Sequence, residues 1–80
     1  MKYQFSLNID IGSMLRKYRS MNSLSQEKVS NHLNISRQAY QKWENNDIDF
    51  SISQLKKIGE LYEIPLHIII TESYTYYKLF

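Results

Sequence analysis

The most constraining feature of this sequence is the segment Leu33-Asn34-Ile35-Ser36, which is all that separates two helical patterns. A connection this short forces the two helices to cross steeply, and one of its residues usually needs a positive φ. Asn34 is among the few residues other than glycine that tolerate this conformation. Ser30 precedes the turn and is small enough to fit where the helices cross. We therefore predict a tight turn at Asn34 between two short, closely packed helices.

Capping residues mark where the helices should begin, because their side chains accept hydrogen bonds from free N–H groups of the first turn. Asp10, Ser25 and Ser36 each precede a run of apolar residues at helical spacing. The apolar residues expected in these three helices and their turn are Ile11, Leu15, Tyr18, Val29, Leu33, Ile35, Tyr40 and Trp43. Together with the turn at Asn34, this pattern predicts a helix-turn-helix unit over about residues 25–45.

Two further helices should follow this unit. Ser51-Ile-Ser-Gln54 has the form of a capping box, and Ile52, Leu55, Ile58 and Tyr62 give the helix behind it an apolar side. Pro65 suits the first turn of a fifth helix over residues 65–71. The predicted fold is therefore a mainly α-helical domain of five helices over residues 10–71.

Both ends of the chain carry strand-like patterns. Residues 1–9 alternate apolar and polar side chains, which is the period of a half-buried strand. Residues 74–80 are rich in aromatic side chains, which favour strands. Because neither segment could form a stable strand alone, we expect residues 1–9 and 72–80 to pair as a small antiparallel two-stranded sheet. The alternative is a pair of frayed apolar tails.

Composition and charge narrow the classes of function. The 80 residues have room for one modest core, so we expect a single domain over residues 1–80. The sequence has no cysteine, no apolar run long enough for a membrane span and no secretory signal, which favours a cytoplasmic protein. Residues 1–45 carry seven Lys/Arg against three Asp/Glu, whereas residues 46–80 carry three against five. The first half is therefore the part suited to a polyanionic partner.

Four stretches of the chain together resemble the Cro/C1-type (XRE family) helix-turn-helix repressors of phages and bacteria. They are IGSMLRKYRS, LSQEKVSNHLNIS, SRQAYQKWEN and ISQLKKIGELYEIPL, which cover about sixty of the 80 residues. The signal is specific because LSQ, ISRQ, KWE and LYEIPL occur together in register. The resemblance implies a lambda-repressor-like fold that binds double-stranded DNA.

Helical geometry divides the third helix into two faces, since an α-helix turns about 100° per residue. The polar side chains fall within about 140° of one another, and Tyr40 and Trp43 fall on the opposite half of the helix. Arginine matches guanine and glutamine matches adenine in the major groove. We predict base contacts from Arg37, Gln38, Gln41 and Lys42. The alternative is a solvated helix face, since these residue types are good helix formers, but the surrounding unit favours the DNA face.

Other polar residues are expected to contact the DNA backbone. Gln26 begins the second helix, where free N–H groups favour an anion, and the resemblance places this position on a phosphate. Ser25, Ser36 and Asn45 are further candidates for phosphate contacts, although capping alone accounts for both serines.

The resemblance also implies a partly buried ion pair between Arg19 and Glu44, which would orient the third helix without contacting DNA. Asn46 departs from the family by replacing a glycine that often closes this helix, and asparagine tolerates the left-handed conformation. Asp47 and Asp49 lie in a loop where relatives often contact phosphates, so we expect weaker affinity for the DNA backbone there.

Ile68 is a second departure, because relatives usually have a polar residue at this position. We expect Ile68, Tyr74, Tyr76 and Tyr77 to form a contact between the subunits of a homodimer. The alternative is that the terminal segments cover Ile68 within one chain.

The leading hypothesis is a sequence-specific transcriptional regulator, a repressor that binds a two-fold operator as a homodimer. The alternative is a protein-binding module on the same scaffold, an antitoxin or anti-repressor partner, that uses the aromatic C-terminal tail. The sequence indicates no enzyme, catalytic residue, cofactor, small-molecule site or membrane partner. His32 and His67 lack the spacing of metal ligands and are expected at the surface.

Overall fold

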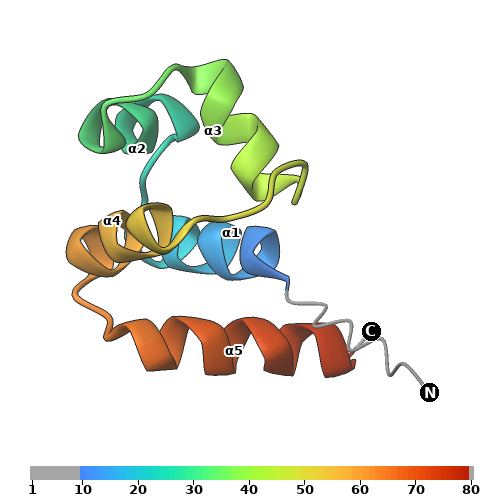
Figure 1. Cartoon of the computed structure of the whole chain (residues 1–80). Helices are drawn as coiled ribbons and strands as arrows, with labels where there is room; N and C mark the ends of the chain where they lie inside the picture. Colours follow the sequence, from blue (N-terminus) through green and yellow to red (C-terminus); the bar gives the residue numbers. More distant parts are fainter. Residues whose placement is uncertain (1–9, 80) are drawn as a thin grey trace.

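The structure, a computed structural model, describes residues 10–79, with side chains as far as Tyr74, and contains five helices (Figure 1). They are α1 (Ile11–Met21), α2 (Gln26–Leu33), α3 (Arg37–Glu44), α4 (Ile52–Tyr62) and α5 (Leu66–Leu79). Helices α2 and α3 form one layer, α1 and α4 the middle layer, and α5 runs along the opposite side (Figure 1). The predicted mainly α-helical architecture of five helices is confirmed.

The helices begin where their capping residues predict. The side chains of Asp10, Ser25, Ser36 and Ser51 each accept a hydrogen bond from the backbone N–H three residues later. The capping box at the start of α4 is complete, because Ser51 N also donates to Gln54 Oε1 at 2.7 Å. These caps satisfy N–H groups that would otherwise lack a partner, so the sequence fixes the start of each of these helices locally.

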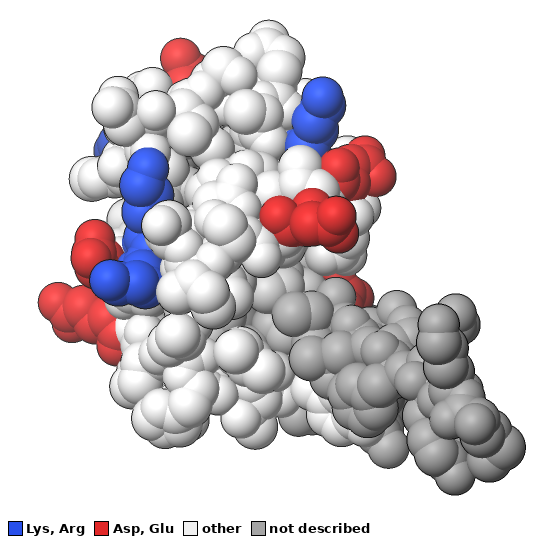
Figure 2. All heavy atoms as spheres, in the orientation of Figure 1, with Lys and Arg blue, Asp and Glu red and all other residues white. Residues whose placement is uncertain are grey.

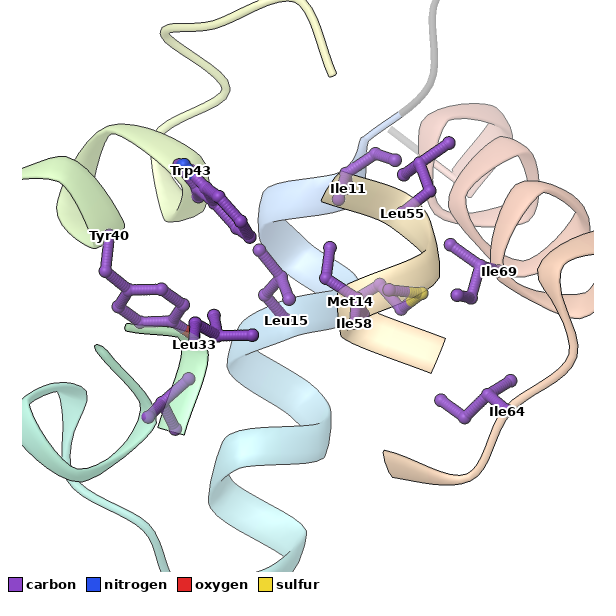
Figure 3. Close-up of a cluster of buried hydrophobic side chains, with 11 residues drawn as sticks. Ile11, Met14, Leu15, Leu33, Tyr40, Trp43, Leu55, Ile58, Ile64 and Ile69 are labelled. Atoms are coloured by element: carbon purple, nitrogen blue, oxygen red, sulfur yellow. The ribbon is translucent and has the colours of Figure 1, made fainter. Parts of the chain in front are cut away.

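One hydrophobic core lies between the layers (Figure 3). Its buried side chains are Ile11, Met14, Leu15, Val29, Leu33, Tyr40, Trp43, Leu55, Ile58, Ile64 and Ile69. Trp43 of α3 points toward Leu15 of α1, which connects the first layer to the second (Figure 3). Ile52, which was expected on the apolar side of this helix, is 59% exposed because it is the first residue of α4.

The predicted C-terminal strand is also wrong, because α5 continues without a break past Thr71 to Leu79. Ile69 and Ser73 are both fully buried, and their spacing of four residues matches one turn of a helix. Ser73 Oγ donates to Ile69 O at 2.7 Å, so its hydroxyl is satisfied within the helix. Residues 1–9, the expected partner strand, lie outside the described residues. Residues 10–79 contain no strand, and the expected two-stranded sheet is therefore not formed.

Polar contacts hold α5 against α1. Asp10 N donates to Ser73 O at 3.2 Å, next to the start of α1. Toward the other end of α1, the Tyr18 hydroxyl lies 2.8 Å from both carboxylate oxygens of Glu72. Because α1 also contacts α3 on its opposite side, it is the element through which the core positions α3.

Candidate nucleic-acid interface

The turn between α2 and α3 has the predicted geometry. Asn34 adopts the left-handed conformation, with φ 59° and ψ 43°. Its N–H donates to Asn31 O at 3.1 Å and Ile35 N donates to Ser30 O at 3.0 Å, so two carbonyls of the last turn of α2 are satisfied. Ser30 is 1% exposed, and its hydroxyl donates to Glu27 O at 2.8 Å. A buried small residue and a left-handed asparagine therefore set how α2 and α3 cross.

Helix α3 has one buried side and one exposed side. Tyr40, Trp43 and Glu44 are buried. The outer face of α3, as we define it, comprises the four residues predicted to contact bases: Arg37, Gln38, Gln41 and Lys42. Of these, Gln41 alone is half-buried and the other three are exposed. The residue burial therefore follows the two faces predicted from helical geometry, except that Gln41 is half-buried although it falls within the polar face.

The ion pair implied by the family resemblance is present and joins α1 to α3. Arg19 Nε lies 2.6 Å from Glu44 Oε2, and Arg19 Nη2 donates to Glu44 Oε1 at 3.2 Å. The side chain of Glu44 is 3% exposed and that of Arg19 is 21% exposed. Burial alone would raise the pKa of Glu44, but the hydrogen bonds that its carboxylate accepts, above all those from Arg19, outweigh burial and lower this pKa. Glu44 therefore remains a carboxylate in the folded protein at neutral pH.

Glu44 is also the end point of a chain of hydrogen bonds from the outer face. Gln41 Nε2 donates to Gln26 Oε1 at 3.3 Å, and Gln26 Nε2 donates to Glu44 Oε1 at 3.1 Å. The side chains of Gln26 and Gln41 are both half-buried. The structure thus joins Gln26, Gln41 and the pair of Arg19 and Glu44 in one hydrogen-bonded network. The sequence did not predict this network.

A second set of contacts, also missed by the sequence analysis, holds the C-terminal end of α3 against the first turn of α1. Arg16 donates to the backbone carbonyl of Glu44. Gly12 N donates to Asn46 Oδ1 at 2.9 Å, and Asn46 Nδ2 donates to Asp10 Oδ1 at 2.8 Å. The sequence signal for this contact was an isolated glycine inside a helical pattern, which often marks a close approach of two segments.

Gly12 is required here by space. A Cβ atom at this position would lie 2.1 Å from the backbone carbonyl oxygen of Glu44, far inside the van der Waals distance. Helices α1 and α3 therefore touch backbone to backbone at this point. Asn46 completes the contact in the left-handed conformation predicted for it, with φ 58°.

A shallow hollow lies between the start of α2 and the start of α3. It is lined by Arg19, Ser25, Gln26, Glu27 and Arg37. Arg37 and the free N–H groups of the first turn of α2 favour an anion in this hollow, whereas the Glu27 carboxylate opposes one and Arg19 is already paired with Glu44. The predicted phosphate contacts Ser25 and Gln26 thus lie beside a predicted base contact, whereas Asn45 is exposed at the far end of α3.

Charge is unevenly distributed around α3. The view in Figure 2 shows scattered charges of both signs and, among the described residues, no continuous basic area on this face. Acidic side chains gather over the loop that follows α3, where Asp47 and Asp49 are exposed (Figure 2). Favourable contacts with a polyanion are therefore concentrated at the start of α2 and on the outer face of α3.

The residues predicted for a dimer contact are only partly described. Ile68 is half-buried and packs against the edge of the core of its own chain, so it is less exposed than expected. Tyr74 is 40% exposed on α5. The side chains of Tyr76 and Tyr77 lie outside the described part of the structure.

Other features bear on alternative functions. His32 and His67 are exposed, as predicted. Within the described residues, no group of three or more histidine or acidic side chains is placed to hold a metal ion. No helix within residues 10–79 combines the length and the apolar character needed to cross a bilayer.

Two helices joined by a left-handed asparagine, with a polar outer face on the second helix, define a helix-turn-helix protein. Residues 12–74 match the family described as "Helix-turn-helix domain", and the chain belongs to this family. The resemblance to the Cro/C1-type (XRE) group is thereby confirmed at the level of the family.

Two curated relatives are similar to this chain. They are uncharacterized HTH-type transcriptional regulators from Sinorhizobium medicae (strain WSM419) and Rhizobium meliloti (strain 1021). Each is 33% identical over 60 residues, which is 75% of this chain and 43% of the relative. The chain therefore matches less than half the length of each relative.

Proposed function

We propose that this protein is a sequence-specific DNA-binding transcriptional regulator that inserts α3 into the major groove. The observation that carries the proposal is the division of α3 into two sides. Tyr40 and Trp43 anchor the helix in the core, while three of the four side chains on its outer face are exposed. The major groove of B-DNA is wide enough for an α-helix and presents a distinct pattern of donors and acceptors for each base pair. The similarity to two HTH-type transcriptional regulators supports the same function.

Base recognition would come mainly from the N-terminal half of α3. Arg37 and Gln38 occupy its first two positions, which in helix-turn-helix proteins contact base edges. The guanidinium of Arg37 suits O6 and N7 of guanine, and the amide of Gln38 suits N6 and N7 of adenine. Lys42, one turn further along, would donate to guanine or to a phosphate.

Contacts to the phosphates of the DNA backbone would set the register of α3 on the duplex. Ser25 and Ser36 accept capping hydrogen bonds from Lys28 N and Ala39 N, each at 3.0 Å. A capping hydroxyl still has its own O–H to donate, so both serines remain able to bind a phosphate. Gln26 has one further N–H, and Asn45 is exposed, so the same proposal extends to them.

A domain of this size contacts few base pairs, so we propose that it acts as a homodimer on a two-fold operator. Half-sites would then lie about 34 Å apart, one helical turn of DNA. The subunit contact would involve α5, where Tyr74 is exposed, together with the predicted positions Ile68, Tyr76 and Tyr77. Repression would follow because the bound dimer occludes RNA polymerase.

A second candidate function is a protein-binding module on the same scaffold. It is favoured by the exposed apolar side chains Tyr74, Met21 and Ile52, which are 40%, 66% and 59% exposed. Apolar contacts depend little on salt, whereas a DNA-binding protein releases counterions and loses affinity steeply as salt rises. Salt dependence therefore separates the two functions.

The proposed function is tested by selecting bound fragments from random duplex DNA at low salt and then measuring affinity for the selected site at increasing salt. We expect one preferred site with two-fold symmetry, and an affinity that falls linearly with salt on logarithmic axes. Arg37→Ala should relax the preference at one base pair of each half-site. It should also weaken the free energy of binding to the preferred sequence by about 1–3 kcal/mol.

Lys56→Ala is the matched control, because it removes one positive charge from an exposed position on α4, outside the helix-turn-helix pair. It should leave the base preference unchanged. If the wild type selects no sequence at low salt, the proposed function is wrong and the protein-binding module becomes the better account.

A further inference from the structure

Gln41 differs from the other residues of the outer face. Arg37, Gln38 and Lys42 are exposed, whereas Gln41 is half-buried and its amide already makes a hydrogen bond to Gln26. A glutamine amide has two N–H donors and one oxygen acceptor. One of the two donors of Gln41 is therefore used inside the protein, and this limits what it can offer to a base.

The direction of this hydrogen bond is set by a buried charge. Glu44 is ionised and 2% exposed, and an ionised carboxylate can only accept hydrogen bonds. Gln26, which lies 3.1 Å from Glu44 Oε1, must therefore turn its NH₂ group toward the carboxylate. Its oxygen then faces the other way.

The same reasoning fixes the amide of Gln41. The oxygen of Gln26 can only accept, so Gln41 must present its NH₂ group to it, as the 3.3 Å contact between Gln41 Nε2 and Gln26 Oε1 shows. The atoms of Gln41 left for a partner are one N–H and the oxygen. Rotating the amide of either glutamine by 180° would place two acceptors or two donors against each other.

We propose that Gln26 is a positioning residue that makes Gln41 select adenine over guanine. This inference rests on the proposed function. Adenine offers an acceptor at N7 and a donor at N6, which match the remaining N–H and oxygen of Gln41. Guanine offers two acceptors, O6 and N7, and would need both N–H groups of one amide. With one N–H held by Gln26, that second donor is absent.

The test begins with the wild-type protein and its selected site. Gln41→Ala identifies the base pair that Gln41 contacts, because preference is lost there alone. Affinities are then measured on two duplexes that differ only by adenine or guanine at this position. We expect the wild type to prefer adenine by about tenfold or more.

Gln26→Met is the decisive variant. Methionine has a similar length and helix propensity, but its sulfur is only a weak acceptor for a hydrogen bond from Gln41. The amide of Gln41 is then free to rotate and to donate twice, so the preference for adenine over guanine should fall to about twofold or less. Gln26→Ala is a second variant that removes the acceptor. The thermal unfolding of both variants is measured first, to show that they fold like the wild type.

Two further variants separate positioning from other roles. Gln26→Glu would set a second carboxylate against Glu44, so its side chain should turn away from Gln41 and the adenine preference should fall as it does in Gln26→Met. Asn31→Ala removes an exposed side chain of α2 that does not line the hollow and should leave the adenine preference unchanged.

The outcomes distinguish this inference from the proposed function. If Gln26→Met and Gln26→Ala weaken binding equally on both duplexes, Gln26 is a phosphate contact alone and the inference is overturned. A wild type with no adenine preference at the Gln41 position also overturns it while leaving the proposed function intact. If the wild type binds no specific duplex, both the inference and the proposed function are wrong.

Discussion

The two ends of α3 are held in different ways. At its C-terminal end, Glu44 and Asn46 are bonded to four residues that precede α2, which are Asp10, Gly12, Arg16 and Arg19. At its N-terminal end, Ser36 caps the helix locally, and Arg37 and Gln38 are exposed. One end is therefore fixed by contacts distant in sequence, while the other end is supported mainly by its own turn.

The residues that orient α3 on the core therefore differ from those that are exposed to another molecule. Contacts to α1 set the direction in which α3 points, because they hold both its last carbonyl and its last side chain. The exposed end has few internal partners to lose, so its side chains are available to another molecule. Substitutions at the C-terminal end of α3 should therefore lower the free energy of unfolding more than substitutions at its N-terminal end.

The largest effect is expected from Gly12→Ala. The added Cβ would lie 2.1 Å from Glu44 O, so α1 and α3 must move apart and the contacts around Glu44 are strained. We expect a loss of about 3 kcal/mol in the free energy of unfolding, measured by urea titration.

Ser20→Ala is the matched control for this substitution. It introduces alanine at an exposed position of the same helix and should be neutral or slightly stabilising, because alanine has the higher helix propensity. A Gly12→Ala protein as stable as the wild type would show that the backbone contact does not constrain α3.

The next largest effect is expected from Glu44→Gln. This change keeps the shape of the side chain but removes the charge that Arg19 and Gln26 both bond. We expect a loss of about 2 kcal/mol at pH 7, because Arg19 is partly exposed and can recover hydrogen bonds from water.

The same variant should alter the response to acid. Because the pKa of Glu44 in the folded protein is lowered from 4.5, its contribution is present above pH 4.5 and is lost as the pH falls through the folded-state pKa. The stabilities of wild type and Glu44→Gln, measured from pH 7 down to pH 3, should therefore converge at low pH. A constant difference over this range would contradict the assigned role of the carboxylate.

A smaller effect is expected from Asn46→Ala. The change removes hydrogen bonds to Gly12 and Asp10 and places alanine at φ 58°. We expect a loss of about 1.5 kcal/mol in unfolding experiments. Asn46→Gly separates the two causes, since glycine adopts this φ without strain but restores neither hydrogen bond. Equal stability of Asn46→Gly and wild type would mean that the hydrogen bonds contribute nothing.

The smallest effect on folding is expected at the exposed end. Arg37→Ala and Gln38→Ala should each change the free energy of unfolding by less than about 0.5 kcal/mol, because both side chains are exposed on a capped helix. Thermal and urea unfolding of the two variants would measure this directly. A loss comparable to that of Asn46→Ala would erase the contrast between the two ends of α3.

The parts of the fold that local chemistry determines were predictable from the sequence. The caps at Asp10, Ser25, Ser36 and Ser51, and the left-handed Asn34, depend on residues within a few positions of one another. The C-terminal strand was mispredicted because the aromatic residues favour strands locally, whereas the burial of Ile69 and Ser73 against α1 stabilises a helix. A buried serine carries no hydrophobic signal, so the helical period was hidden.

The site was predictable in outline and not in its connections. The outer face of α3 follows from helical geometry, and the ion pair between Arg19 and Glu44 from family resemblance. The hydrogen bonds from Gln41 through Gln26 to Glu44, and from Asn46 to α1, join residues far apart in the chain. No local pattern encodes such contacts, because they depend on how the helices pack.

The absence of a side chain at Gly12 has a consequence for engineering. Where α1 and α3 meet there, their separation is set by peptide atoms that do not change when side chains are substituted. The tilt of α3 should therefore survive replacement of the four amino acids on its outer face. Under the proposed function, the outer face of α3 could accordingly be exchanged to change which DNA sequence is bound, and the core would not need to be redesigned each time.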